Sequence, residues 1–130
     1  MASPAKNANL YESFKNAFIG IKTTIKRERN IKIHLTISLL IFMMALLLGV
    51  NQIEWLILLM CVGIVIALEL INTAIEDVVD LAANMEYHLL AKQSKDAAAG
   101  AVLVASMMSF AIGLIIFLPK IWDTVMSLIH

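Results

Sequence analysis

Three long apolar stretches constrain the fold of this chain more than any other feature of its sequence. They lie at residues 31–50, 53–75 and 97–118. Twenty helical residues, each rising about 1.5 Å, cover the roughly 30 Å hydrocarbon core of a bilayer. Hydrophobic residues make up 61% of the chain, and a soluble domain has only roughly 45–50%. We therefore predict an all-α integral membrane protein with three transmembrane helices.

The predicted organisation is a single membrane domain over residues 1–130. Its helices are expected at residues 10–29, 31–50, 53–84 and 97–118, and the last three contain the spans. Asn51–Gln52 would form the turn between the first two spans, and residues 86–95 a polar connection before the third. Pro119 and Lys120 are expected to end the third span, because proline disrupts a helix interior.

An amphipathic helix is predicted ahead of the spans, at residues 10–29. Its apolar face is formed by residues three or four apart: Leu10, Phe14, Ala17, Phe18, Ile21 and Ile25. An apolar stripe beside a lysine-rich side is typical of a helix in the membrane interface; a solvated helix packed on a partner is the alternative. We favour the helix in the membrane interface because the membrane spans come directly after it in the sequence. Residues 1–9 are polar and are expected to be frayed.

The basic residues predict how the chain is oriented in the membrane. Nine of the ten lysine and arginine residues precede the first span or lie between the second and third spans. The turn at Asn51 has none, and the C-terminal end has only Lys120. Because cytoplasmic segments carry the excess of lysine and arginine, we expect the N-terminus in the cytoplasm and the C-terminus outside.

Small residues lie four apart on one face of the third span, at Ala101, Ala105, Ser109 and Gly113. Small faces of this kind let membrane helices approach each other closely. A bundle of three spans is also too thin to enclose a site well. Both features predict a homo-oligomer.

Four polar residues share one face where the second helix meets the cytoplasm: Glu69, Asn72, Glu76 and Asp80. Their spacing of three, four and four residues places them within an arc of about 80°. Counted from Trp55 at the outer interface, Glu69 lies roughly 21 Å down the helix and Glu76 roughly 31 Å. Glu69 is therefore expected within the hydrocarbon, and Glu76 and Asp80 at or past its inner boundary.

This polar stripe predicts a functional site. An ionised carboxylate inside the membrane costs several kcal/mol unless it is paired or neutralised. Glu76 and Asp80 repel each other unless a cation lies beside them, and Mg²⁺ prefers oxygen ligands and bridges phosphates. Glu69, buried more deeply, suits a general base. A lone intramembrane glutamate can be a protonated packing residue, but four polar groups on one stripe favour function.

Other candidate residues lie on the cytoplasmic side. Glu28 stands among basic residues that anchor the first span, and it is placed to join the same metal site. Lys95 can meet a phosphate as a point charge, and His88 can donate to one, although each alone is more often a solvated loop residue. The chain has neither a P-loop nor a protein-kinase signature. A bound nucleotide is therefore not held by a glycine-rich loop.

The sequence resembles the prokaryotic diacylglycerol kinase family, small membrane enzymes unrelated to other kinases. The resemblance covers nearly the whole chain and rests on Glu69-x-x-Asn72-Thr73-Ala74-Ile75-Glu76-x-x-Val79-Asp80, then Glu86-x-His88 and Lys95-Asp96. Two further stretches are more similar to the Gram-positive branch, whose usual substrate is undecaprenol: Arg27-Glu28-Arg29-Asn30 and Phe117-Leu-Pro-Lys-Ile-Trp122.

The resemblance implies a homotrimer in the bacterial plasma membrane, with active sites between subunits and on the cytoplasmic side. It implies ATP and Mg²⁺, with Glu69 as the catalytic base that meets the lipid hydroxyl. Glu28 and Glu76 would be the metal-binding carboxylates. The nucleotide-binding residues it implies are Asn16, Glu28, Asn72, Glu76, Asp80, Glu86, His88, Lys95 and Asp96.

The predicted function is an ATP- and Mg²⁺-dependent lipid kinase that phosphorylates the hydroxyl of undecaprenol. A diacylglycerol kinase that makes phosphatidic acid is the alternative substrate assignment. A proton-relay or small transporter subunit, with Glu69 as its protonatable group, is the alternative from a different class. The other spans carry no buried ionisable partner for Glu69, and this absence counts against a continuous proton path.

Overall fold

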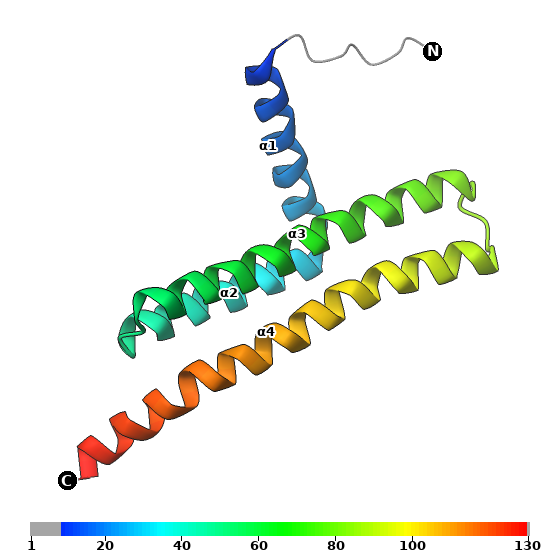
Figure 1. The fold of residues 1–130 in the computed structure, drawn as a ribbon. Helices are drawn as coiled ribbons and strands as arrows, with labels where there is room; N and C mark the ends of the chain where they lie inside the picture. Colours follow the sequence, from blue (N-terminus) through cyan, green and yellow to red (C-terminus); the bar gives the residue numbers. More distant parts are fainter. Residues whose placement is uncertain (1–8, 130) are drawn as a thin grey trace.

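The computed structural model describes residues 9–129, and within this range it contains four helices and no strands (Figure 1). They are α1 (Leu10–Arg27), α2 (Arg29–Leu47), α3 (Gln52–Ala82) and α4 (Leu89–Ile129). In the described residues, α2, α3 and α4 are each long and apolar enough to cross a membrane. The predicted all-α architecture with three candidate spans is therefore confirmed.

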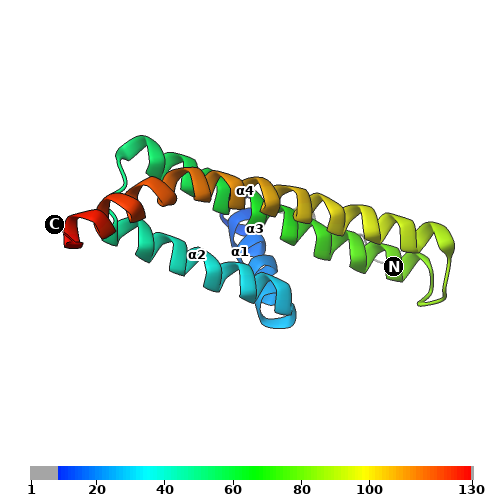
Figure 2. The same ribbon diagram turned by 90° about the horizontal axis from the view of Figure 1, so that it is seen from below.

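The three long helices form one antiparallel bundle. α3 packs against α4 along much of its length, and α2 lies on α3. α1 leaves the bundle at a steep angle, transverse to the long helices (Figure 1 and Figure 2). In this arrangement the C-terminal end of α1 lies beside α3, where Arg27 bonds Asp77.

The tight turn between α2 and α3 is stabilised by a helix cap. Gly49 has a φ of 61°, a left-handed conformation that glycine adopts without steric cost. The Asn51 side chain accepts hydrogen bonds from the backbone N–H groups of Ile53 (2.9 Å) and Glu54 (3.0 Å). Glu54 accepts from the Asn51 N–H in return (2.7 Å), and this reciprocal pair is a capping box. Lys120 of α4 forms an ion pair with Glu54 of α3 at 3.0 Å, and this pair links α3 to α4.

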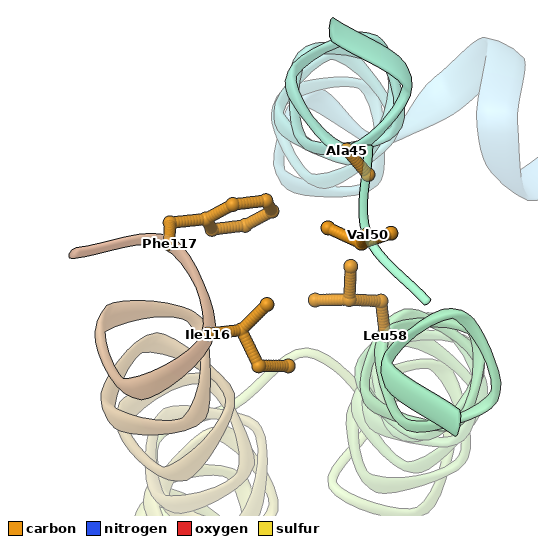
Figure 3. Packing of buried hydrophobic residues seen from close by; sticks show 5 residues of the cluster. All are labelled: Ala45, Val50, Leu58, Ile116 and Phe117. Carbon is orange, nitrogen blue, oxygen red and sulfur yellow. The ribbon is translucent and has the colours of Figure 1, made fainter. Parts of the chain in front are cut away.

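An apolar cluster joins α2, α3 and α4 near this turn (Figure 3). Its buried members are Ala45, Val50, Leu58, Ile116 and Phe117. In a bilayer the lipid tails are as apolar as these side chains, so close packing rather than exclusion of water stabilises the cluster.

The helix boundaries differ from the predicted ones most clearly in α4. The connection expected at residues 86–95 is confined to residues 83–88, where Asn84 and Met85 have positive φ values of 50° and 60°. α4 also continues through Pro119 to Ile129, so the expectation that Pro119 and Lys120 end the helix is wrong. Proline removes one helical hydrogen bond, and neighbouring groups in membrane proteins can compensate for that loss.

Smaller differences occur near the N-terminus. α1 ends at Arg27 rather than at residue 29, and α2 already begins at Arg29. Asn9, expected to be frayed, instead caps α1 by accepting a hydrogen bond from the Glu12 N–H at 2.9 Å. The expected fraying of residues 1–8 lies outside the described residues.

The apolar cluster generates a stability prediction. Leu58→Ala should lower the free energy of unfolding in mixed detergent micelles by about 2 kcal/mol, because Leu58 is 3% exposed and its removal leaves a cavity. The adjacent Leu59 is 51% exposed, and Leu59→Ala should cost less than about half as much. Equal losses in an SDS titration of the two variants would show that the cluster does not stabilise the bundle.

Candidate functional site

Buried polar side chains lie in the middle of α3, on the stripe predicted from the sequence. Glu69 is 3% exposed, and Asn72 and Thr73 are buried with it. The Thr73 hydroxyl donates to the backbone carbonyl of Glu69 at 3.1 Å, one turn back along the same helix. The Glu69 carboxylate is therefore removed from solvent within a single protomer.

Asn72 connects this buried part of the stripe to its more exposed part, which holds Glu76 and Asp80. Its side-chain Nδ2 donates to Glu76 Oε1 at 3.0 Å. Its Oδ1 is buried and has no hydrogen-bond partner in the described structure. An unpartnered buried acceptor costs about 1–3 kcal/mol. This oxygen, next to the Glu76 carboxylate, is therefore suited to meet a donor or a cation from another molecule.

The C-terminal part of α3 and the first turns of α4 are joined by an ion pair. α4 spans 41 residues, which is about 60 Å and roughly twice the thickness of a hydrocarbon core. Its first turns, before the predicted span at 97–118, therefore project beyond the membrane. Lys95 Nζ donates to both carboxylate oxygens of Asp80, at 2.9 and 3.0 Å. The hydrogen bond to Asp80 is the main reason that the pKa of Lys95 is raised above its ordinary value, so the ammonium group stays charged.

A second ion-pair cluster, which the sequence did not reveal, lies at the joint between α1 and α2. We call Arg27, Glu28 and Asp77 the joint cluster. Arg27 Nε donates to Glu28 Oε1 at 2.7 Å, and Arg27 Nη2 donates to the two oxygens of Asp77 at 2.7 and 2.9 Å. Asp77, followed by Glu28, raises the pKa of the guanidinium further above its ordinary value.

Arg27 and Asp77 were missed because each had another explanation. In the sequence, Arg27 is one of several basic residues that are expected to anchor the first span. Asp77 points away from the polar stripe. The available signal was weak: an arginine and an aspartate 50 residues apart, each next to a predicted metal-binding glutamate in the sequence.

Four of the predicted nucleotide-binding residues are not brought to the stripe. Asn16 is exposed on α1, about 17 Å along the helix from its end at Arg27. Glu86 and His88 are exposed between α3 and α4. Asp96 is exposed as well and pairs with Lys92 on the same helix at 2.6 Å.

The predicted metal-binding residues offer oxygen atoms, the ligand type that Mg²⁺ prefers. Glu76 and the unpartnered Asn72 Oδ1 lie on one turn of α3, and Glu28 reaches the neighbouring Asp77 through Arg27. Among residues 9–129, no three carboxylate, histidine or cysteine side chains are close enough to hold a metal by themselves. The donor set therefore fits Mg²⁺ when water and phosphate oxygens complete the coordination.

An apolar groove of about 500 Å³ lies between α2, α3 and α4. Phe117 and Ile121 line the end of the groove that is nearer the α2–α3 turn, and His34, Ser38 and Val65 line the part farther from that turn. Val65 is one helical turn from Glu69. A long apolar molecule in this groove would therefore have one end near the buried carboxylate.

The chain matches the family model described as prokaryotic diacylglycerol kinase over residues 15–117. An undecaprenol kinase of Bacillus subtilis is 44% identical over 111 residues, which cover 85% of this chain and 89% of that protein. A diacylglycerol kinase of Synechocystis sp. is 39% identical over 113 residues, covering 87% of this chain and 65% of that protein. A diacylglycerol kinase of Haemophilus influenzae is 31% identical over 97 residues, covering 75% and 81%. The match includes the whole polar stripe and both ion-pair clusters, and the chain belongs to the prokaryotic diacylglycerol kinase family.

Proposed function

We propose that this lipid kinase transfers the γ-phosphate of ATP to the hydroxyl of undecaprenol at the cytoplasmic boundary of the membrane. The observation on which the proposal rests is Glu69, a carboxylate buried in a membrane helix and continued by Asn72, Glu76 and Asp80 toward the cytoplasm. The substrate assignment is supported by the 44% identity to a protein named undecaprenol kinase. It is also supported by the Gram-positive character of the stretches around Glu28 and Pro119.

The polar stripe suits a lipid alcohol that meets a soluble nucleotide. The apolar groove can hold the lipid chain, with its hydroxyl beside Glu69. Glu69 accepts the proton of that hydroxyl, and the oxygen attacks the γ-phosphate as the proton leaves. Lys95, kept charged beside Asp80, offers a cation to the phosphates of ATP from the cytoplasmic side. Mg²⁺, held by Glu28 and Glu76, would neutralise charge on the transferred phosphoryl group.

The remaining predicted residues complete the nucleotide site in this proposal. Asn72 and Asp96 belong to the stripe and to the start of α4, and Asn16, Glu86 and His88 approach the nucleotide from α1 and the α3–α4 connection. Phosphoryl transfer depends chiefly on such positioning and on electrostatic stabilisation. A homotrimer with sites between subunits is part of the proposal, because three spans leave the stripe open on one side.

α1 is proposed to lie on the cytoplasmic surface of the membrane. Its large apolar residues Leu10, Phe14 and Phe18 are exposed in the protomer, and the helix is transverse to the bundle (Figure 1). A helix in this orientation can bury its apolar face among the lipid head groups. The N-terminus and the active site are then cytoplasmic, and the C-terminus lies outside.

The substrate assignment predicts the outcome of a direct comparison in mixed micelles with labelled ATP and Mg²⁺. Phosphate transfer to undecaprenol should exceed transfer to diacylglycerol by about tenfold in kcat/KM, a difference of about 1.4 kcal/mol in the barrier. Faster formation of phosphatidic acid would replace undecaprenol by diacylglycerol as the substrate. Transfer to neither lipid by folded, oligomeric protein, together with ATP-independent proton flux in liposomes, would favour the relay or transporter alternative.

The proposed orientation predicts which single cysteines react in intact cells. In a Cys61→Ser background, Gln52→Cys at the outer turn should be labelled by a membrane-impermeant maleimide. Tyr87→Cys, in the exposed α3–α4 connection, should be labelled only after the membrane is broken. The labelling of both variants after lysis is the control for reactivity. Labelling of Tyr87→Cys but not Gln52→Cys in intact cells would invert the orientation.

A further inference from the structure

The joint between α1 and α2 holds Glu28 in an unusual way. Glu28 is the single residue between the two helices, with an extended backbone (φ −89°, ψ 131°), and its N–H donates to the Thr24 carbonyl at 2.8 Å. It stands at the N-cap position of α2, where a short polar side chain such as that of Ser, Thr, Asp or Asn commonly bonds the first free N–H groups. The Glu28 side chain makes no such bond. Its carboxylate is therefore available for another role.

Arg27 supplies the contact that fixes the Glu28 carboxylate. The guanidinium is planar, and its donors leave in fixed directions. The Nε–H group of Arg27 donates to Glu28, and Nη2 donates to both carboxylate oxygens of Asp77. The direction in which Glu28 points is thus linked, through one rigid group, to a position on α3.

Asp77 is placed so that this link leads to the proposed active site. Consecutive residues on a helix diverge by about 100°, so Asp77 faces the joint while Glu76 remains on the polar stripe with Asn72. Asp77 and Glu76 are adjacent in the sequence. The bond between Arg27 and Asp77 therefore places the joint between α1 and α2 at the same height along α3 as Glu76. Ile31, in the first turn of α2, is fully buried beside this joint in the sequence.

The energetics favour an effect on orientation over an effect on stability. The side chains of Arg27, Glu28 and Asp77 are 50%, 30% and 56% exposed. Ion pairs at such exposed positions contribute about 0–1 kcal/mol to folding. A displacement of about 1 Å in a positioned catalytic group can nevertheless slow a reaction about a hundredfold. Ile31 and the helix contacts can stabilise the joint without this cluster, but they cannot direct a carboxylate.

We infer that Arg27 and Asp77 are positioning residues that hold Glu28 toward Glu76 for cation binding. The inference rests on the proposed function, in which Glu28 and Glu76 bind the metal of the ATP complex. Neither Arg27 nor Asp77 has to touch the substrate. Together they set the position of a ligand carried on the single residue between α1 and α2.

The test measures cation binding, not only activity, in the full-length protein in detergent. Mn²⁺ is the probe, with a non-hydrolysable ATP analogue, and its binding is followed by electron paramagnetic resonance. Arg27→Gln and Asp77→Asn should each weaken Mn²⁺ binding about tenfold (about 1.4 kcal/mol). The double variant should bind Mn²⁺ no more weakly than either single variant, because both substitutions remove the same link between Glu28 and α3. Arg27→Lys should retain part of the Mn²⁺ affinity, because lysine keeps the positive charge but lacks the planar set of donors of the guanidinium.

Two controls separate positioning from a general loss of structure. Lys120→Gln breaks an ion pair between helices at the opposite end of the bundle, and should leave Mn²⁺ binding unchanged. Glu28→Gln should weaken binding at least as strongly as Arg27→Gln. Thermal unfolding of Arg27→Gln and Asp77→Asn should stay close to that of the wild type.

The outcomes distinguish this inference from the proposed function itself. Unchanged Mn²⁺ affinity in Arg27→Gln, in protein whose Glu28→Gln variant has lost binding, would overturn the positioning role and leave the kinase proposal intact. A loss in Arg27→Gln without a loss in Asp77→Asn would overturn the link to α3. Failure of the wild type to bind Mn²⁺ with the nucleotide analogue would overturn the metal assignment on which the inference rests.

Discussion

The free energy of placing a carboxylate inside a bilayer is the constraint on which the rest of this structure depends. Glu69 belongs to a helix that is apolar enough to cross the membrane, yet it is almost completely buried within a single protomer. A charged group there costs several kcal/mol unless neighbouring groups compensate. Asn72, Glu76 and Asp80 continue the stripe along α3, from the buried Glu69 to carboxylates that are partly exposed. A lipid hydroxyl and a nucleotide can meet on such a surface without either leaving its own phase.

The two ends of the bundle are held together by different interactions. At the end that holds the α2–α3 turn, a capping box, the Glu54–Lys120 pair and a packed apolar cluster stabilise the turn. Toward the opposite end, two partly exposed ion pairs link the helices, Asp80 with Lys95 and Arg27 with Asp77. Such pairs contribute little to stability. They can also exchange partners when a polyanion such as ATP arrives, and this property suits the end of the bundle where binding is proposed.

Local patterns predicted much of this architecture. Apolar length gave the three spans, and the spacing of Glu69, Asn72, Glu76 and Asp80 placed them on one helix face, where the structure pairs Asn72 with Glu76. These predictions succeed because both depend on the chain over a few turns.

The features that sequence reasoning missed are set by tertiary structure. The bond between Arg27 and Asp77 joins residues 50 apart, and no local pattern indicates that α1 ends beside that part of α3. The continuation of α4 through Pro119 was missed because the rule for proline comes mainly from helices in water. The proposed place of Asn16 and His88 around a nucleotide follows from no local pattern, and both side chains are exposed in the single chain.

The central claim is that Glu69 is the base that removes the proton from the lipid alcohol. The most direct test is the rate of γ-phosphate transfer from ATP to undecaprenol by Glu69→Gln, which keeps the shape of the side chain and removes its basicity. Asp123→Asn, an amide replacement at an exposed site near the C-terminal end of α4, is the matched control. The account predicts a loss of about 10²–10⁴-fold in kcat for Glu69→Gln, with nucleotide binding retained and the control unaffected. A Glu69→Gln protein that transfers phosphate at close to the wild-type rate would contradict it.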